Sequence, residues 1–349
     1  MNIAGAASAF PKHYYPQKTL IDAFRKHWGS KLENPTLIDR LHARACVDGR
    51  YLVLPMEAYP DLATWGQANN FWIEAAVDLG EEAIGQALER AGLAPSDVGA
   101  LFFVSITGIS SPSIDARLIN RMGLPRNIRR IPVFGLGCVA GAAGLSFAAD
   151  YVRAYPDKVA VLLSVELCSL TLQREDLSVA NLISSGLFGD GACAVVVAGG
   201  ERGLAGPRIC GTRSVFYPDT EDVMGWDVSE KGFRIVLSPA VPEVARQHLA
   251  VDVDAFLAEM NLGREDIGSW LLHTGGPKVL EAMQDALGLH DGELAASWDC
   301  LKKTGNLSSA SVLVVLEEVM LHRRPAPGTW GLLAAMGPGF CSELVLLRW

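Results

Sequence analysis

The chain has 349 residues, of which 50% are hydrophobic and 20% are charged, and its formal net charge is −9. This length suits two domains, and this composition is typical of a compact α/β enzyme and excludes a disordered or fibrous protein. The acidic balance and the lack of a Lys/Arg block argue against a nucleic acid partner, and no apolar run reaches the ~18 residues that a membrane-spanning helix needs.

The N-terminal segment lacks the marks of a secretory signal. It has no basic region, and Pro11 interrupts its short apolar stretch, so we expect no signal peptide. The seven cysteines are scattered and form no C-x-x-C pair, which predicts neither a zinc site nor a disulfide framework. We therefore expect no metal, and we expect the protein to be cytoplasmic, where its cysteines would stay reduced.

The first half of the chain predicts an alternation of strands and helices around one cysteine. Apolar runs that end at glycines read as buried strands, and apolar residues at helical spacing read as helices. The expected elements are a strand, a helix, a short strand, a helix that begins at Cys138 and a closing strand, over residues 100–108, 111–124, 131–137, 138–151 and 158–167.

The second half repeats this order. The expected elements are a strand, a helix, a connector that ends in a glycine turn, a helix and a strand, over residues 269–276, 277–289, 290–306, 308–320 and 329–339. Gly137-Cys138 and Gly305-Asn306 fall at matching points, and at the same offset His273 falls opposite Ser105. Any α/β chain repeats such units, but we favour a duplicated fold whose two halves contribute to one site.

Cys138 is the strongest candidate for a nucleophile. It follows a glycine turn and opens a helix rich in Ala and Gly, and a helix N-terminus lowers the pKa of a thiol. The alternative is a small buried side chain, which is the usual role of a free cysteine and the one that we expect for the other six.

His273 and Asn306 are the candidate partners of Cys138. A cysteine nucleophile needs an imidazole within hydrogen-bond reach, although a histidine at a strand end is often structural. Asn306 opens a helix, where Asn is a good cap, so capping is the alternative to catalysis. Together, His273 and Asn306 could donate hydrogen bonds to an oxyanion or enolate that forms beside Cys138. Papain-like hydrolases use the same three residue types, but their sequence around the cysteine is absent here.

Five short motifs resemble those of the chalcone synthase-like, or type III polyketide, synthases. These motifs are GCVAG, LFGDGA, HTGG, GNLSSAS and MGPG, at residues 137–141, 187–192, 273–276, 305–311 and 336–339. They occur in the right order and spacing, and the resemblance runs from about Arg40 to the C-terminus. Each motif alone would be weak, but the set is specific.

The resemblance implies an α/β, thiolase-type αβαβα fold with two pseudo-repeated halves, and a homodimer. We divide the chain into residues 1–201, which carry the nucleophile, and residues 202–349, which carry the histidine and asparagine. Cys138 would hold the acyl group, and His273 and Asn306 would serve decarboxylation and oxyanion binding. The substrates would be acyl-CoA and malonyl-CoA, with no further cofactor.

The resemblance also implies which residues shape the cavity. Phe188 matches a phenylalanine between the coenzyme A tunnel and the cavity, although it could be an ordinary core aromatic. The other expected cavity residues are Ile106, Thr107, Glu166, Cys168, Thr171, Trp226, Ile235, Ser308, Met336, Gly337, Pro338 and Gly339. Arg40 and Arg44 match two positions of a basic helix that binds coenzyme A phosphates, and a third position is Leu37 here. They share one helical face, which could equally be a solvated charged surface.

Departures from the plant pattern bear on the substrate. Ile235 replaces a second gatekeeping phenylalanine, Trp226 replaces a glycine, and Ile106-Thr107 replaces a Thr-Ser pair. Residues 224–238 are similar to bacterial enzymes that accept fatty acyl starters. Apolar replacements would favour an alkyl chain, since each buried methylene contributes ~0.8 kcal/mol. Trp226 could instead block the route of aromatic starters.

We therefore predict an acyltransferase that condenses malonyl-CoA repeatedly onto a fatty acyl starter on Cys138 and cyclises the product to an alkylpyrone or alkylresorcinol. One alternative is an enzyme similar to ketoacyl synthase III that performs a single condensation. The other is an inactive homologue that binds acyl groups. Starter length, the number of extensions, the mode of ring closure and delivery by an acyl carrier protein stay open.

Overall fold

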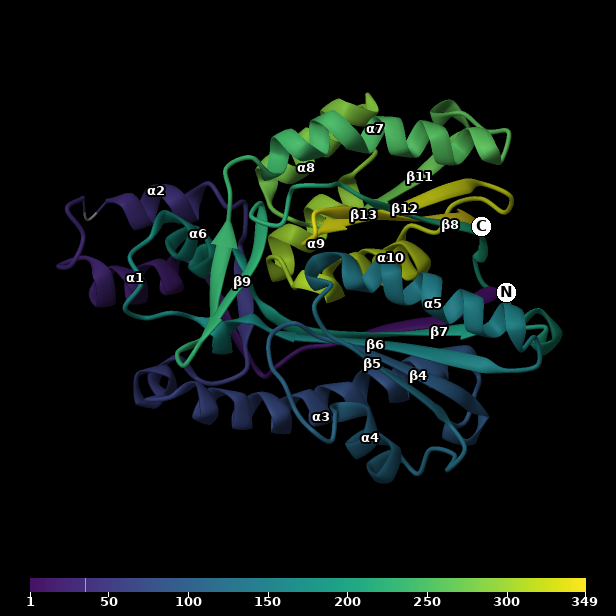
Figure 1. Ribbon diagram of the computed structural model, residues 1–349, viewed down its shortest axis with the longest axis horizontal. Coiled ribbons are helices and arrows are strands. Elements are labelled where there is room, and N and C mark those ends of the chain that lie inside the picture. Colours follow the sequence, from purple (N-terminus) through teal and green to yellow (C-terminus); the bar gives the residue numbers. More distant parts are fainter. Residues whose placement is uncertain (35) are drawn as a thin grey trace.

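The computed structural model describes residues 1–34 and 36–349 (Figure 1). Its main feature is a nine-stranded sheet with the strand order β11-β12-β13-β8-β1-β7-β6-β4-β5. The first half of the chain supplies β1 (Asn2–Ala9), β4 (Val98–Val104), β5 (Arg129–Val133), β6 (Val159–Leu167) and β7 (Asp190–Ala198). The second half supplies β8 (Arg208–Phe216), β11 (Ile267–Leu272), β12 (Trp330–Gly337) and β13 (Cys341–Arg348).

The elements form five layers, α, β, α, β and α, as Figure 1 shows from top to bottom. The central layer consists of α5 (Ala140–Ala154) and α10 (Ser311–His322), which are almost entirely apolar where they face the strands. The outer layers are α7 (Val241–Glu259) and α8 (Pro277–Leu287) on one side, and α3 (Trp65–Ala91) and α4 (Ile114–Met122) on the other. This is the thiolase-type architecture that the sequence predicted.

The two halves repeat each other with one difference. β1, α3, β4, α4, α5, β6 and β7 have the counterparts β8, α7, β11, α8, α10, β12 and β13. In the second half, α9 (Ala295–Thr304) leads directly to the Gly305-Asn306 turn, and among the described residues no strand there corresponds to β5. The repeated order of the sequence is therefore a repeated order in space.

The two halves share a hydrophobic core, and their parts of the sheet meet where β1 pairs with β8. β1 and β8 pair only at Asn2 and Arg208, so the sheet is narrowest between them. The largest cluster of buried apolar side chains draws on both halves and includes Val139, Leu162, Leu313 and Val345. The division at residues 201 and 202 falls in a short 3-10 helix, η5 (Gly200–Arg202), and it stays a prediction.

Small residues allow the central helices to approach their neighbours closely. A Cβ atom on Gly141 of α5 would lie 2.2 Å from the carbonyl oxygen of Ser309, just before α10. A Cβ on Gly144 would lie 2.4 Å from the side chain of Leu162 in β6. These contacts seat the start of α5 against the start of α10 and against the sheet.

A smaller group of elements packs beside the layers, on the left of Figure 1. It contains two antiparallel strand pairs, three α-helices and two 3-10 helices. The members are β2 (His13–Pro16), α1 (Gln17–Trp28), α2 (Leu37–Ala43), β3 (Gly49–Leu52), η1 (Met56–Asp61), η4 (Cys168–Thr171), α6 (Val179–Leu187), β9 (Met224–Ser229) and β10 (Gly232–Leu237). The remaining 3-10 helices are η2 (Pro95–Asp97), η3 (Gly137–Val139), η6 (Arg264–Asp266) and η7 (Ser308–Ala310).

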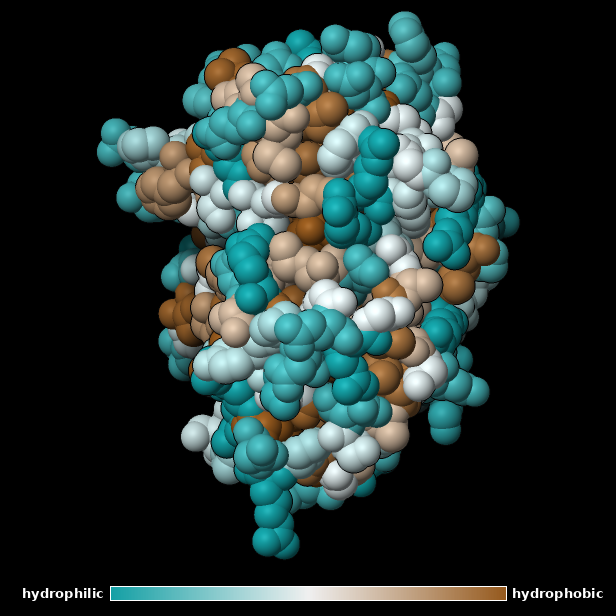
Figure 2. Space-filling view, turned by 90° about the vertical axis from the view of Figure 1, so that its right-hand side faces the viewer, coloured by the Kyte–Doolittle hydropathy of each residue, from teal (hydrophilic) through white to brown (hydrophobic). Residues whose placement is uncertain are grey.

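The opposite end of the layers carries both chain termini (Figure 1). Figure 2 shows the face on that side, where small hydrophobic patches are separated by hydrophilic side chains. None of the helices in residues 1–34 and 36–349 combines the length and the hydropathy needed to cross a membrane.

Candidate active site

Cys138 lies at the centre of the molecule, where the two halves meet. Gly137 before it has a φ of +57°, and a Cβ there would lie 2.7 Å from the ring of Pro338, so the turn requires glycine. The cysteine belongs to η3, and α5 begins only at Ala140. Its Sγ lies 3.6 Å from the Oγ of Ser308, in the other half of the chain.

The environment of Cys138 differs from the expectation that a helix N-terminus would lower its pKa. The side chain is only 6% exposed, and burial raises the pKa of the Cys138 thiol to about 12, although the contact with Ser308 opposes this shift. Removal from water disfavours the thiolate because it is the charged form. This direction is opposite to the expected lowering of the pKa, and the role of Cys138 as the nucleophile stays a prediction.

His273 follows β11 directly and lies near Cys138, beside a small cavity that both residues line. Its backbone N–H donates to the carbonyl oxygen of Ala334 at 3.0 Å, which continues the pairing of β11 with β12. The side chain is 3% exposed, and its Nδ1 has no hydrogen-bond partner within the part of the chain that the structure describes. Burial lowers the pKa of His273 to about 4, so the imidazole is neutral near pH 7. No hydrogen bond joins His273 to Cys138 within the described part of the chain, but both side chains line a cavity of about 10 Å³.

Asn306 is held rigidly between two turns. Its Oδ1 accepts hydrogen bonds from the backbone N–H of Ser308 at 2.7 Å and from the Oγ of Ser311 at 3.3 Å. Its Nδ2 is buried and has no hydrogen-bond partner among the described residues. The N-caps of η7 and α10 are Leu307 and Ala310, so Asn306 holds the preceding turn through Oδ1 and its Nδ2 stays free to donate.

Ser308 has a strained backbone beside these groups. It is a non-glycine residue with a φ of +48°, and the hydrogen bond from its N–H to Asn306 holds it there. Its hydroxyl lies within contact distance of the Cys138 thiol.

The main cavity beside the cysteine has a volume of about 190 Å³, and we call it the Cys138 cavity. Seven of the predicted cavity residues line it, together with Cys138 itself. They are Ile106, Cys168, Phe188, Trp226, Ile235, Ser308 and Pro338. Met336 lines the small cavity at His273, and Thr171 lines a further chamber described below. The sequence did not single out Phe134, Met224 and Phe340, which also line these cavities, because no motif marks them.

Four predicted cavity residues lie behind the walls of all three cavities: Thr107, Glu166, Gly337 and Gly339. Glu166 accepts hydrogen bonds from the Oγ1 of Thr107 at 2.9 Å and the backbone N–H of Ile106 at 3.1 Å, and it also contacts Ser309. These bonds engage both polar side chains outside the walls of the three cavities, and a role of either residue at the cavity stays a prediction. Burial raises the pKa of Glu166 to about 7, and the hydrogen bonds oppose this shift.

The loop at residues 337–339 acts through its backbone. A Cβ on Gly337 would lie 2.7 Å from the backbone nitrogen of Val139, so this loop packs directly on the cysteine turn. The loop after β8 fastens it: Phe340 N–H donates to Thr220 Oγ1 at 2.6 Å, and Tyr217 N–H donates to the carbonyl oxygen of Phe340 at 2.9 Å. No motif in the sequence indicates this contact, because Thr220 and Phe340 are 120 residues apart.

The β9–β10 hairpin covers the Cys138 cavity. Trp226 and Ile235 are directly opposite each other in the two strands, and both line the cavity. Phe233 packs against Trp226, with ring centroids 5.9 Å apart, and against Phe134. The three departures from the plant pattern thus lie around the cavity, since Ile106 is also in its wall.

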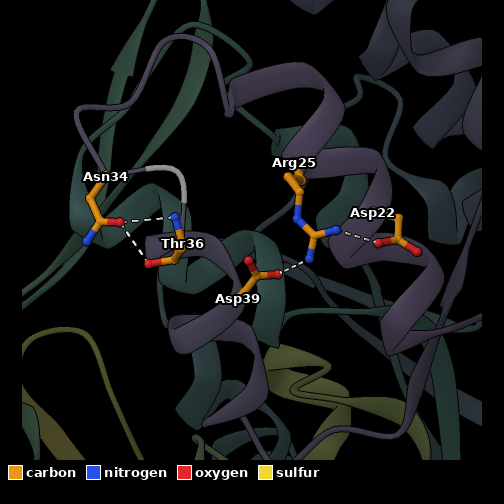
Figure 3. Close-up of polar contacts among 5 residues, drawn as sticks. All are labelled: Asp22, Arg25, Asn34, Thr36 and Asp39. Carbon is orange, nitrogen blue, oxygen red and sulfur yellow. Dashed lines mark hydrogen bonds and ion pairs between the residues drawn. The ribbon is translucent and has the colours of Figure 1, made fainter.

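Arg40 and Arg44 are exposed, on α2 and at its C-terminal end, and they line none of the three cavities. Figure 3 shows how α2 is fixed. Arg25 of α1 contacts Asp39, and Asn34 Oδ1 accepts from the backbone N–H of Thr36 at 3.1 Å. Asp39 is thereby engaged by α1, and in residues 1–34 and 36–349 no ion pair involves Arg40 or Arg44. Their binding of coenzyme A phosphates stays a prediction.

Comparisons with known proteins agree over the whole chain. The model for chalcone and stilbene synthases matches in its N-terminal part at residues 2–201 and in its C-terminal part at residues 209–349. A 1,3,6,8-tetrahydroxynaphthalene synthase of Streptomyces peucetius subsp. caesius is 51% identical over 100% of this chain and 93% of its own length. A phloroglucinol synthase of Pseudomonas fluorescens is 32% identical, with 97% of each chain covered. The crystal structure of 1,3,6,8-tetrahydroxynaphthalene synthase from Streptomyces coelicolor A3(2), a bacterial type III polyketide synthase, superposes with a TM-score of 0.96 at 32% identity, covering 100% of this chain and 99% of that one.

Proposed function

The chain belongs to the chalcone and stilbene synthase family of type III polyketide synthases, and on that premise we propose that it builds a tetrahydroxynaphthalene-type product from malonyl-CoA alone. The observation that carries this proposal is the 51% identity to a synthase of that name over the full chain. Members of this family are acyltransferases that work on coenzyme A thioesters without a further cofactor.

The product's carbon skeleton explains why malonyl-CoA would suffice. A naphthalene has ten ring carbons, and the four hydroxyls at positions 1, 3, 6 and 8 fall on alternate carbons of its perimeter. Five two-carbon units joined head to tail give this pattern, with the fifth oxygen lost as water at a ring-fusion carbon. Each unit comes from one malonyl group after loss of CO₂, so no separate starter is needed.

Loading begins with Cys138 and His273, both neutral in the free protein. Sγ of Cys138 attacks the thioester carbonyl of the incoming acyl-CoA, and the proton of the thiol passes to the imidazole of His273. The carbon–sulfur bond to coenzyme A breaks, and the proton passes on to the departing sulfur. The acyl group is then a thioester on Cys138, and His273 is neutral again.

Condensation uses hydrogen-bond donors that have no partner in the resting site. The carboxylate of a second malonyl-CoA leaves as CO₂, and its electron pair moves onto the thioester oxygen to form an enolate. Asn306 Nδ2 and the imidazole N–H of His273 bind this oxygen, which neutral and pre-positioned donors do well in a site of low dielectric. The enolate carbon attacks the acyl carbonyl on Cys138, and the cysteine sulfur leaves. The extended chain, now on coenzyme A, returns to Cys138 for the next cycle.

A fatty acyl starter, which the sequence favoured, is the second candidate. The specific observation for it is the apolar character of Ile106, Trp226 and Ile235 around the Cys138 cavity. Closure of the chain would then give an alkylpyrone or alkylresorcinol. The relatives named for tetrahydroxynaphthalene favour the first candidate instead. A homodimer, as the family resemblance implies, and a cytoplasmic location, as the cysteines imply, complete the proposal.

Product analysis separates the two candidates. Purified protein is given malonyl-CoA alone, and then malonyl-CoA with a series of acyl-CoA starters of increasing chain length, and the products are identified by mass spectrometry. We expect the same tetrahydroxynaphthalene in every reaction, and none from Cys138→Ala. Products whose mass tracks the starter would replace this proposal with the second candidate, and a single β-keto product would indicate a one-step condensing enzyme.

A further inference from the structure

A second chamber adjoins the Cys138 cavity. Its volume is also about 190 Å³, and we call it the side chamber. Cys168, Phe188, Trp226 and Ile235 line both spaces and therefore form the partition between them. The rest of its wall is largely apolar and comes from α1, β3, η1, η4 and α6. An acyl chain that grows beyond the Cys138 cavity would meet this chamber next.

Arg50 is the one polar group in the described wall of the side chamber that is charged at neutral pH and fully enclosed. It lies in β3 and is 3% exposed. Its Nη1 donates to the carbonyl oxygen of Phe188 at 2.5 Å, while its Nε and Nη2 are buried and have no hydrogen-bond partner in residues 1–34 and 36–349. Burial lowers the pKa of Arg50 to about 10, which still leaves it protonated at neutral pH.

The neighbouring acid does not occupy these donors. Asp190 is buried near Arg50, and its charge supports the protonated guanidinium. However, its two carboxylate oxygens accept hydrogen bonds from Ser169 N–H at 2.8 Å, Ser169 Oγ at 2.5 Å and Val53 N–H at 2.7 Å. Cys168 and Tyr59 are the other ionisable neighbours, and the Tyr59 hydroxyl contacts Ser169 Oγ at 2.6 Å. The guanidinium is therefore balanced in charge but not in hydrogen bonds.

The two free donors have the geometry of a carboxylate site. Nε–H and one Nη2–H of an arginine point in the same direction and form a fork that matches the two oxygens of a carboxylate. The turn at Gly189 and the turn at Gly305 pack against the aliphatic part of Arg50, so the fork is fixed in place. A buried, unpartnered donor pair costs stability unless something binds it.

We propose that Arg50 binds the terminal carboxylate of the growing acyl chain, and that the side chamber accepts acyl groups that end in a carboxylate. This inference rests on the proposed priming by malonyl-CoA, because a malonyl starter that keeps its carboxylate gives every later intermediate such an end. The first extension would give a 3-oxoglutaryl group on Cys138.

Once an extended chain reaches Arg50, the pairing also explains how its distal end would keep a carboxylate of the kind that each extender loses. Decarboxylation converts the carboxylate into neutral CO₂, so an ion pair with Arg50 stabilises the starting state and is lost in the transition state. The donors of His273 and Asn306 act on the thioester oxygen instead, where charge develops. Arg50 would therefore slow the loss of CO₂ at the distal end while the other site promotes it.

Competition between two starters of equal length tests the proposal. Glutaryl-CoA has the length of the 3-oxoglutaryl group and cannot lose CO₂ in the same way, and pentanoyl-CoA replaces its carboxylate by a methyl group. The full-length protein is given both at equal concentration, and the acyl groups on Cys138 are counted by intact-protein mass spectrometry. We expect the wild type to favour glutaryl by at least about tenfold, and Arg50→Met to reduce that ratio by about tenfold to a hundredfold, since two charge-assisted hydrogen bonds are lost.

Arg153→Met is the matched control. Arg153 is an exposed arginine of α5 that lines none of the three cavities, and its Nη1 donates to Asp150 Oδ1 at 2.6 Å, so we expect the ratio to stay within about twofold. Should Arg50→Met fail to fold, Arg50→Lys keeps the charge without the fork and should still lower the ratio. A wild type without preference, or an Arg50 variant that loads both groups less but in the same ratio, would overturn the proposal. Tetrahydroxynaphthalene formation from malonyl-CoA by the wild type reports on the proposed function separately.

Discussion

Burial sets the charge of the individual groups at this site. Cys138 and His273 are both almost fully enclosed, and enclosure raises the pKa of the thiol to about 12 and lowers the pKa of the imidazole to about 4. A resting thiolate–imidazolium pair is therefore disfavoured, and the two groups stay neutral until a thioester is in place.

The first prediction concerns the reactivity of Cys138. Its alkylation by iodoacetamide should rise about tenfold per pH unit from pH 7 to pH 10, since the thiolate fraction of a group with a pKa of about 12 grows in that way. Peptide mass spectrometry after timed labelling measures the rate at this cysteine, and Cys138→Ser identifies the peptide. A plateau below pH 8 would mean that an ion pair with His273 forms in the free protein.

The second prediction concerns Glu166. Its pKa in the folded protein is about 7, above the ordinary value of 4.5, so the folded state holds the proton more tightly than the unfolded state. Stability should therefore fall as pH rises from 4.5 through 7, by about 3 kcal/mol in total. Glu166→Gln cannot ionise and should lose this part of the pH dependence, measured by urea unfolding at a series of pH values. An unchanged slope in the variant would contradict the assignment.

At the scale of elements, the two helices of the central layer position the site. α5 follows the turn that carries Cys138, and α10 follows the turn that carries Asn306. In each case a short 3-10 helix, η3 or η7, comes directly before the α-helix. Their close approach depends on Gly141, whose missing side chain leaves room for the carbonyl oxygen of Ser309. Ser309 is the neighbour of Ser308, whose Oγ contacts Cys138. The packing of α5 against the segment before α10 therefore affects the position of Ser308 relative to Cys138.

The third prediction compares two glycines in helices. Gly141→Ala should destabilise the protein by about 1–3 kcal/mol and lower kcat, because the new methyl group forces apart backbone segments that carry Cys138 and Ser308. Gly85→Ala, in α3, meets nothing within 4 Å and should stabilise by about 0.5–1 kcal/mol. Urea unfolding and steady-state rates measure both, and similar effects of the two substitutions would contradict this account of the central layer.

At the scale of the whole molecule, the two halves depend on each other. Their shared core includes side chains from both, such as Val139 and Leu313. Arg90 of α3 also reaches across: its Nη1 lies 2.5 Å from Glu317 Oε1 in α10 and 2.5 Å from the carbonyl oxygen of Ala6. Neither half could bury its apolar faces alone.

The fourth prediction follows from that shared core. Calorimetric unfolding should show one transition, and residues 1–201 and 202–349 made separately should each lack the near-ultraviolet circular dichroism of a packed core. The intact protein is the control for both fragments. Two separate transitions, or a packed fragment, would mean that the halves are independent folding units.

The sequence by itself determined the family and the alternation of strands and helices, and it singled out Cys138, His273 and Asn306 as the candidate set. These features are encoded in short stretches, where a glycine turn, a strand end or a helix start dictates its own local structure. The sequence predicted the first and last residues of these elements less accurately. The strand expected over residues 131–137 ends at Val133, since it lies at the sheet edge and is partly exposed, and α5 begins two residues after Cys138.

Only the tertiary structure decided which groups are charged, which residues face the cavities and what lies beyond them. Elements that are far apart in the chain together bury each of these groups. No motif therefore indicates that burial raises the pKa of Cys138 and of Glu166. Likewise, the free donors of Arg50 exist because the Phe188 turn, Asp190 and the side chamber meet around one strand, which local sequence does not show.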